Sequence, residues 1–302
     1  MNRRRFVLSA AALAALPAAP AALLAAPATA ARFERGLLWR IERAGVPPSH
    51  VYGTIHVADS RLGELPAPVR KAFDGSKSLL LEFLADGYTK ERFLEAAMFA
   101  DRQTLEQTIG HDDFERALEQ LAPIGLPREF VNHLKPWGVL LNLRASGAAG
   151  GEAAAPLDAQ LAALARDRRM ALGQIEGVEE QIFTFDEFPM ESQVALLKHA
   201  LVHRAELEEL GRRTLEAYLA RDLAAIWRLR EAYSARYPEI APHEAVFTKR
   251  VVYDRSVVMA FRMQRELRRG RAFVALGALH LYGSRGVLAL LEDDGFKARV
   301  VY

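Results

Sequence analysis

Strand-like segments stand at both ends of this 302-residue chain, and the stretch between them is mostly helical in pattern. Residues 37–41 and 51–55 are rich in apolar and β-branched side chains, and the turn-forming residues 45–49 join them, which predicts a hairpin. Residues 272–276 and 297–301 have the same character at the other end. Because strands must pair to satisfy their backbone polar groups, we expect one sheet built from both termini.

Two further segments favour strands inside the chain. Residues 78–83 form a nearly continuous apolar run, as expected of a strand that is covered on both faces, and residues 170–175 form another. The sheet would therefore hold N-terminal, internal and C-terminal strands.

The middle of the chain is predicted to be helical. Residues 88–145 have a helical pattern with breaks at glycine and proline, and apolar side chains recur at helical spacing over residues 189–267. Short helices are expected at residues 66–73 and 287–291. The predicted fold is α/β (α+β mixed), with one central mixed sheet and a large helical middle section.

The first thirty residues predict export. Three arginines at positions 3–5 precede an Ala/Leu-rich run, and Ala28 and Ala30 are the small residues that a signal peptidase recognises. The arginines also resemble a twin-arginine signal. A retained membrane anchor is the alternative, but three prolines and many alanines make the run weakly hydrophobic. We expect a signal peptide at residues 1–30, a single domain at 31–302, and a periplasmic or secreted protein.

Composition excludes several classes of function. The chain has no cysteine, which excludes disulfides, thiolate metal sites and a lipid-anchored lipoprotein. Without the three leader arginines, 37 basic residues face 38 acidic ones, a net charge of −1. This balance does not favour nucleic acid, which needs a concentrated basic surface. No later stretch has the length and apolarity of a membrane span, and the residues do not indicate an oligomeric state.

Two G-x-x-H motifs are the most informative features. Gly53 and His56 form one and Gly277 and His280 the other, each where a strand pattern ends. Glycine permits a close backbone approach or an unusual turn there, and the histidine can project from the end of the sheet, where open α/β folds bind ligands. A single histidine is usually an ordinary core or surface residue. Two in the same setting favour a site.

Two glutamates are further candidates. Glu82 follows three leucines in an apolar run, where an unpaired carboxylate would be unfavourable, so we expect a cation, an arginine or a metal as its partner. The alternative is that Glu82 ends the strand and faces water. Glu176 stands between the strand at 170–175 and a helix from Val178, where a helix N-terminus alone would also favour an acid.

One histidine pair is predicted not to be a site. His199 and His203 have the i, i+4 spacing that two metal ligands can use, but no Glu-x-x-His pattern accompanies them. An exposed helix face is the expectation.

Together these residues resemble the TraB/GumN family (TraB/PrgY/GumN), which includes the Tiki proteases. The likeness covers nearly all of the chain after the leader. It includes both G-x-x-H motifs, Glu82, Leu157-Asp158, Ile175-Glu176 with Glu180-Gln181, and the Asp254-Arg255 pair. The chain departs from the family pattern at Pro156, where glycine is common, and at Ser256, where asparagine commonly follows the arginine.

The resemblance implies metal-dependent hydrolysis, with peptide cleavage by some animal members. His56, Glu82 and His280 would bind a divalent transition metal (Mn, Co, Fe or Zn), because imidazoles and carboxylates suit these ions. Glu176 would be a further ligand or a general base, and Arg255 would stabilise an oxyanion or pair with a carboxylate. We expect the side chains of His56, Glu82 and His280 to converge on one cleft.

The predicted function is an exported metal-dependent hydrolase that acts on a peptide or a related amide or ester bond. Its substrate would be a peptide or an envelope component. The alternatives are a non-catalytic periplasmic protein that binds a metal or another ligand, and an accessory protein of envelope assembly or polysaccharide export. The fold does not decide between them, because the site determines the activity.

Overall fold

The computed structural model describes residues 32–57, 59–84, 87–146 and 155–302. Ala31–Tyr302 forms one compact unit. The predicted signal peptide, residues 1–30, lies outside the described residues. In the described part, no helix has the length and apolarity that crossing a membrane requires.

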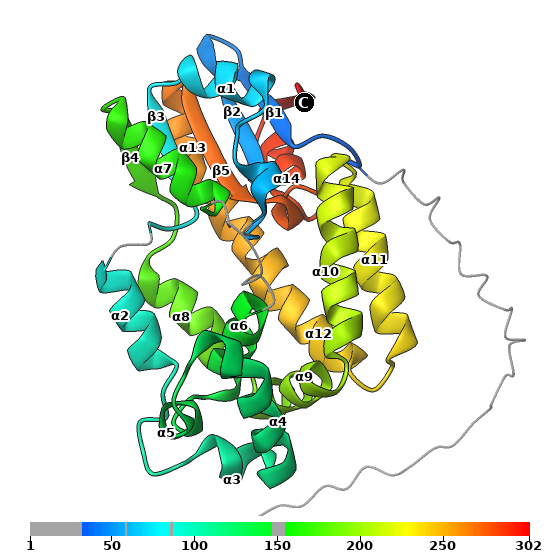
Figure 1. Ribbon diagram of the computed structural model, residues 1–302. Helices are drawn as coiled ribbons and strands as arrows, with labels where there is room; N and C mark the ends of the chain where they lie inside the picture. Colours follow the sequence, from blue (N-terminus) through cyan, green and yellow to red (C-terminus); the bar gives the residue numbers. More distant parts are fainter. Residues whose placement is uncertain (1–31, 58, 85–86, 147–154) are drawn as a thin grey trace, which may run out of the picture. The chain divides into compact units, whose positions relative to one another are not determined.

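One mixed sheet of six strands is present in the described residues, in the order β4-β3-β5-β2-β1-β6 (Figure 1). The strands are β1 Leu38–Arg43, β2 Val46–Thr54, β3 Ser78–Leu81, β4 Ala171–Gln174, β5 Ala272–Gly277 and β6 Lys297–Val300. The four strands from β4 to β2 are parallel, whereas β1 is antiparallel to both β2 and β6. The C-terminal strand β5 thus lies between β2 and β3, and the predicted mixed sheet is confirmed.

The β1–β2 hairpin has a tighter turn than predicted. Gly45 has a φ of +75° in the turn, and β2 begins directly after it, so that Pro47 and Pro48 belong to the strand. The β1–β2 register shifts between Ile41 and Arg43, opposite these prolines. Proline has no N–H to donate to a ladder, which accounts for the irregular pairing. The predicted turn at 45–49 was therefore too long.

The helices of the described residues fill the predicted positions before, between and after the strands. They are α1 Ala67–Asp74, α2 Gly87–Ala96, α3 Leu105–Ile109, α4 His111–Leu121, α5 Arg128–Asn132, α6 Pro136–Ser146, α7 Leu157–Asp167, α8 Val178–Asp186, α9 Met190–Val202, α10 Arg204–Leu219, α11 Leu223–Arg236, α12 Ala241–Thr248, α13 Arg255–Arg269 and α14 Val287–Asp293. Short 3₁₀ segments occur at Ser60–Leu62, Ala122–Ile124 and Ala278–His280.

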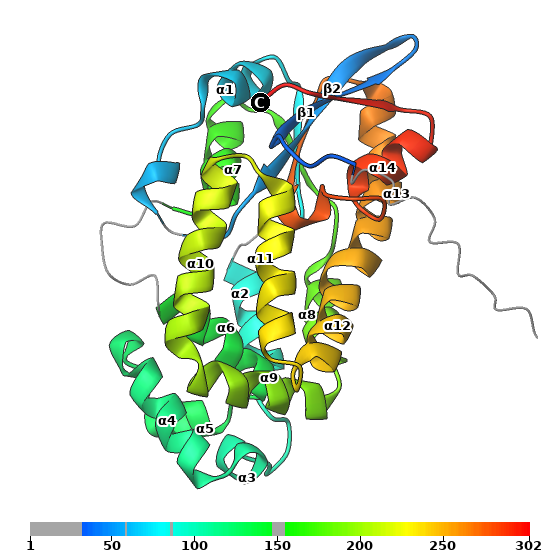
Figure 2. The same cartoon turned by 90° about the vertical axis from the view of Figure 1, so that its right-hand side faces the viewer.

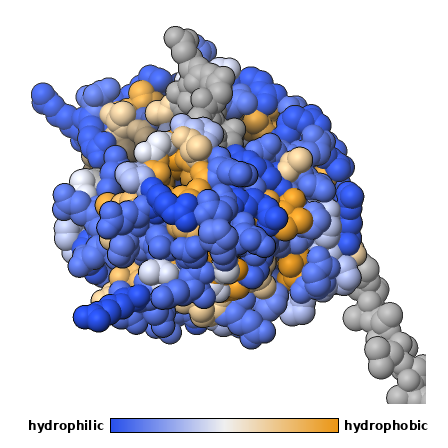
Figure 3. Space-filling view, turned by 60° about the horizontal axis from the view of Figure 1, so that its bottom comes forward, coloured by the Kyte–Doolittle hydropathy of each residue, from blue (hydrophilic) through white to orange (hydrophobic). Residues whose placement is uncertain are grey.

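Helices cover both faces of the sheet. α1 and α7 lie on one face, and α13 and α14 lie on the other (Figures 1 and 2). The side chains of residues 272–276 in β5 are all fully buried, as expected of a central strand between two helical layers. A second apolar core joins α3, α4, α6 and α9. The side of the helical section shown in Figure 3 is mostly hydrophilic, with small hydrophobic areas between polar ones.

α12, a π-helical segment and α13 form one continuous helical run. α12 passes into a π-helical segment, Lys249–Asp254, and α13 begins directly after it at Arg255. A π segment widens the helix locally and changes which side its residues face, and such segments are frequent at functional sites. This one immediately precedes Arg255 and Ser256, and both side chains are buried.

Candidate functional site

The carboxyl ends of the parallel strands bring both predicted glutamates together. Glu82 directly follows β3, so it lies just beyond the strand in which it was predicted, and Glu176 follows β4 by two residues. The backbone N–H of Glu176 donates to the carbonyl oxygen of Glu82 at 2.8 Å. The two residues are therefore neighbours at the sheet edge.

Arg255 joins the two carboxylates. Its Nη2 donates to Glu82 Oε2 at 2.6 Å and to Glu176 Oε2 at 2.7 Å, and its Nε donates to Glu176 Oε2 at 3.0 Å. Gln181 Nε2 also donates to Glu176 Oε2, at 2.7 Å. Exposure is 9% for Arg255, 6% for Glu82 and 4% for Glu176, so Glu82 does not face water. Arg255 is the positive partner expected for Glu82, and it pairs with both carboxylates.

The second oxygen of Glu82 faces the second G-x-x-H motif. Oε1 accepts a hydrogen bond from the Gly277 N–H at 2.5 Å and lies 3.8 Å from His280 Nε2. Gly277 has an ordinary φ of −54°, so the glycine is not required by a turn. A Cβ there would lie 3.2 Å from Glu82 Oε1, tighter than most Cβ contacts. The close approach of backbone to carboxylate is the reason for glycine.

The first glycine packs against the second motif. A Cβ on Gly53 would lie 2.7 Å from Leu281 Cδ1 and 3.1 Å from Ala278 Cα, in the turn that carries His280. β2 and β5 are adjacent parallel strands, and Thr54 pairs with Gly277. The two motifs are thus in direct contact, although 224 residues separate their glycines in sequence.

His280 is buried and held by a serine. It is 4% exposed, and its Nδ1 lies 2.9 Å from Ser256 Oγ, which donates to the Val252 carbonyl at 2.7 Å. Burial lowers the pKa of His280 to about 4, although the charge of Glu82 acts in the opposite direction. The ring is therefore neutral at neutral pH.

The buried cluster holds two carboxyl groups and one guanidinium. Burial opposes ionisation of Glu82, but the positive charges of His280, when protonated, and of Arg255 outweigh it and lower the pKa of Glu82 to about 2. One guanidinium thus lies between two carboxyl groups, and His280 Nε2 lies beside one of them. A buried charge that is not fully balanced favours binding of a further cation or proton.

His56 lies apart from these contacts. Its side chain is 56% exposed, and its Nδ1 lies 3.0 Å from Asp158 Oδ2. The hydrogen bond to Asp158 raises the pKa of His56 against desolvation, and the charges of Glu82 and Arg255 also act on it, so these groups are within electrostatic range. In the described part of the chain, no hydrogen bond or ion pair joins His56 to Glu82 or His280.

Asp158 is the functional candidate that sequence reasoning did not single out. It stands in the first turn of α7, where an acid is ordinary, and it accepts a hydrogen bond from Thr54 Oγ1 at 3.2 Å as well as contacting His56. Its place in the family pattern was a signal in the sequence, but its role follows from the spatial pairing with a G-x-x-H histidine.

The donor set fits a metal in part. Across the described residues, no group of three or more histidine, aspartate or glutamate side chains is arranged to hold a metal ion. Glu82 Oε1 and His280 Nε2 do form a facing oxygen and nitrogen pair, which suits the predicted transition metals. Both oxygens of Glu176 accept hydrogen bonds from Arg255, so in this structure Glu176 is a partner of the arginine.

The expectation for the other histidine pair was wrong. His199 is only 8% exposed, and its Nε2 lies 2.7 Å from Tyr233 Oη on α11. Its ring also packs on those of His203 and Tyr237. The pair belongs to a polar aromatic contact between helices, which the helical spacing alone did not indicate.

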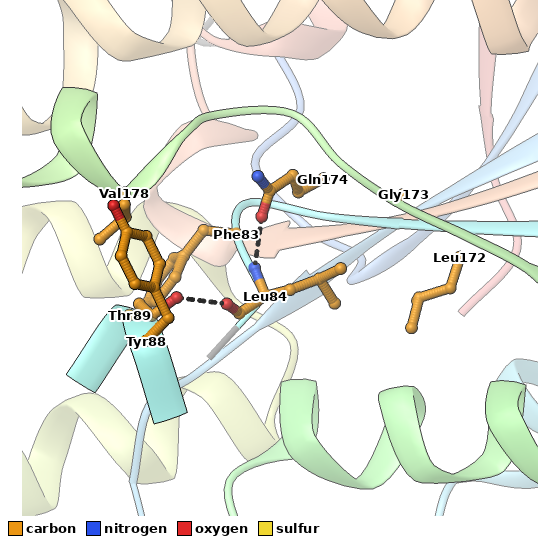
Figure 4. Close-up of a pocket in the computed structure, with 8 residues that line it drawn as sticks. All are labelled: Phe83, Leu84, Tyr88, Thr89, Leu172, Gly173, Gln174 and Val178. Atoms are coloured by element: carbon orange, nitrogen blue, oxygen red, sulfur yellow. Dashed lines mark hydrogen bonds between the residues drawn. The ribbon is translucent and has the colours of Figure 1, made fainter. Parts of the chain in front are cut away.

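A cavity of about 380 Å³ is lined by residues that are close to the two glutamates in the sequence (Figure 4). Phe83 and Leu84, which follow Glu82, line it together with Gln174 and Val178, which flank Glu176. Gln174 Oε1 accepts from the Leu84 N–H at 3.1 Å, as Figure 4 shows. None of the five predicted site side chains lines this cavity.

The fold and the site define a mixed α/β protein with a buried polar centre at the carboxyl edge of its parallel strands. Over residues 37–300 the chain matches the model of the TraB/PrgY/gumN family. The chain belongs to this family, which confirms the resemblance seen in its motifs.

Named relatives are distant. The chain is 24% identical to "Metalloprotease TIKI2" of Xenopus tropicalis and of Danio rerio, over 86% of this chain and 58% and 60% of those proteins. It is also 24% identical to "Uncharacterized protein YbaP" of Shigella flexneri, over 81% of this chain and 88% of that protein. The chain thus spans about three fifths of the TIKI2 proteins. No solved structure gives a significant match.

Proposed function

We propose that this protein is an exported metal-dependent hydrolase that acts on a peptide or a related amide or ester bond. The facing pair of Glu82 Oε1 and His280 Nε2, 3.8 Å apart in a buried polar cluster, is the observation that carries the proposal. The similarity to proteins named metalloproteases supports the same class of reaction. A peptide or an envelope component in the periplasm or outside the cell is the proposed substrate.

Each residue of the centre has a role in this proposal. Glu82 Oε1 and His280 Nε2 would hold a divalent transition metal, with His56 as the third candidate ligand from the neighbouring strand. When bound, such an ion supplies a Lewis acid that acidifies water and polarises a carbonyl group. Arg255 holds the other oxygen of Glu82, and the Gly277 N–H fixes the facing oxygen, so the carboxylate is oriented before any ligand arrives.

Metal binding and hydrolysis can be tested separately. Purified protein without residues 1–30 is titrated with Mn²⁺, Co²⁺, Fe²⁺ and Zn²⁺ by calorimetry, and a peptide library is incubated with it before and after chelation. We expect one ion to bind, chelation to stop cleavage, and added metal to restore it. Glu82→Gln and His280→Ala should weaken binding at least about tenfold, since each removes a ligand or its charge.

His133→Ala is the matched control, because the His133 side chain is exposed and its Nδ1 contacts the backbone carbonyl of Glu129, away from the polar centre. It should bind metal as the wild type does. Binding without cleavage of any substrate would favour the non-catalytic alternative. Cleavage that survives complete removal of metal would refute the proposal.

A further inference from the structure

Both G-x-x-H histidines are held through the same ring atom. His280 Nδ1 contacts Ser256 Oγ at 2.9 Å, and His56 Nδ1 contacts Asp158 Oδ2 at 3.0 Å. The holders come from different helices, α13 and α7, and from positions far apart in sequence. The shared geometry therefore does not follow from a repeated local motif.

The contacts of Ser256 determine where the proton of His280 lies. A serine hydroxyl has one hydrogen, and Ser256 donates it to the Val252 carbonyl, which can only accept. The oxygen of Ser256 then accepts from His280, so Nδ1 carries the hydrogen and Nε2 carries the lone pair. That lone pair lies on the atom 3.8 Å from Glu82 Oε1.

Asp158 imposes the same arrangement on His56. An ionised carboxylate only accepts hydrogen bonds, so the Nδ1 that faces it must carry the hydrogen. Thr54 Oγ1 donates to the same carboxylate, at 3.2 Å to Oδ1 and 3.4 Å to Oδ2, and this fixes the orientation of Asp158. A helix-start acid that served only the helix dipole would need neither contact.

We infer that Asp158 and Ser256 are positioning residues, which hold the rings of His56 and His280 through Nδ1 and leave Nε2 unprotonated whenever the rings are neutral. Their use in presenting ligands rests on the proposed function, but the positions of the protons are a property of the metal-free chain. Free histidine prefers the proton on Nε2, so this pair of tautomers has to be imposed by the protein. Hydrogen-bond partners of this kind orient metal-binding histidines and raise their basicity.

Nitrogen NMR of the metal-free protein tests the inference directly. Long-range ¹H–¹⁵N spectra distinguish the two neutral tautomers of each histidine, and at about pH 9 the rings are neutral, since the usual histidine pKa is about 6.5. We expect His56 and His280 to carry the hydrogen on Nδ1. In Asp158→Ala, His56 should change to the Nε2–H form while His280 keeps its signal.

Two comparisons separate positioning from general structure. Asp112→Ala removes another acid from the first turn of a helix, α4, and should change no tautomer. His133 serves as an internal reference, because its Nδ1 faces the Glu129 carbonyl at 2.8 Å and neither variant touches it. Circular dichroism establishes that each variant is folded.

Metal titration supplies a second readout. Asp158→Ala and Ser256→Ala should each lower metal affinity by about 10- to 100-fold, and Ser256→Thr should restore it, because threonine keeps the oxygen and its bond to the carbonyl four residues before. A wild-type His56 or His280 with its hydrogen on Nε2 would overturn the inference, as would unchanged affinity in both alanine variants. If the tautomers are as expected but no metal binds, the proposed function fails and the positioning assignment stands.

Discussion

A single buried guanidinium compensates two carboxylates in this protein. Glu176 retains Gln181 as a second partner, whereas Glu82 depends on Arg255 and on one backbone N–H. Removing Arg255 would therefore leave two buried negative charges without a positive partner. The residue is central to stability whether or not it takes part in a reaction.

Arg255→Leu should lower the free energy of unfolding by about 3–5 kcal/mol, the usual effect of removing one partner from a buried ion pair. Arg262→Leu is the matched control on the same helix, because Arg262 pairs with Glu180 at a largely exposed site and should matter by about 1 kcal/mol or less. Urea unfolding measures both. Equal losses in the two variants would contradict the assignment of a buried cluster.

The glycines of the two motifs are required by neighbours rather than by backbone conformation. Gly53→Ala should destabilise the protein by about 1–3 kcal/mol, because the new Cβ overlaps the turn that carries His280. Gly173→Ala in β4 is the comparison, since its Cβ would meet only Leu80 Cγ at 3.9 Å. Thermal unfolding should show a lower Tm for the first variant alone. A Tm of Gly53→Ala equal to the wild-type value would show that Gly53 does not pack against the turn that carries His280.

Sequence reasoning identified single residues better than their partners. The unfavourable position of Glu82 in an apolar run and the repeated G-x-x-H pattern were visible without coordinates. Asp158 and Gln181 belonged to the family likeness but received no role, because each is otherwise an ordinary residue at a helix start. The pairing of His56 with Asp158 joins residues 102 positions apart.

At the scale of elements, strands were predicted more accurately than turns and helix faces. Apolar runs mark buried strands directly, and the strands at 78–81, 171–174 and 272–277 all lie within or next to their predicted ranges. The hairpin turn was misplaced because a proline pair resembles a loop signal even where it belongs to an irregular strand. α9 was predicted to present His199 to water. That prediction failed because the burial of His199 depends on Tyr233 of α11, a contact between two helices that the spacing within one helix does not indicate.

The buried His199 predicts a pH effect on the helical section. Desolvation and the charge of His203 lower its pKa below the usual value, against the opposing charges of Glu239, Glu244 and Glu206. The unfolded chain then binds more protons than the folded one just below about pH 6.5, so stability is present above that pH and falls as the pH decreases through it.

His199→Gln should reduce this loss of stability between about pH 7 and pH 5, because glutamine does not titrate and can still bond to Tyr233. Urea unfolding at a series of pH values measures it. His133→Gln, at an exposed position, should keep the wild-type slope. An unchanged slope in His199→Gln would mean that His199 titrates as it does in the unfolded chain.

At the scale of the whole molecule, the arginines at positions 3–5 and the Ala28–Ala30 site predict maturation on export. Protein recovered from the periplasm or the medium should begin at Ala31, and mass spectrometry of the intact protein checks this. A variant with Ala28 and Ala30 changed to bulky residues should retain its leader. Native protein that keeps Met1 and stays in the cytoplasm would exclude this prediction.

The central place of β5 determines when the molecule can be completed during synthesis. β2 and β3 leave the ribosome early, but they are not neighbours, and residues 272–277 must fill the space between them. Arg255, Gly277 and His280 also emerge late, so the nascent chain carries Glu82 for most of translation without the groups that will hold it. Such long-range pairing slows folding. The sheet and the polar centre at its edge are therefore completed together, and only once the last fifty residues are available.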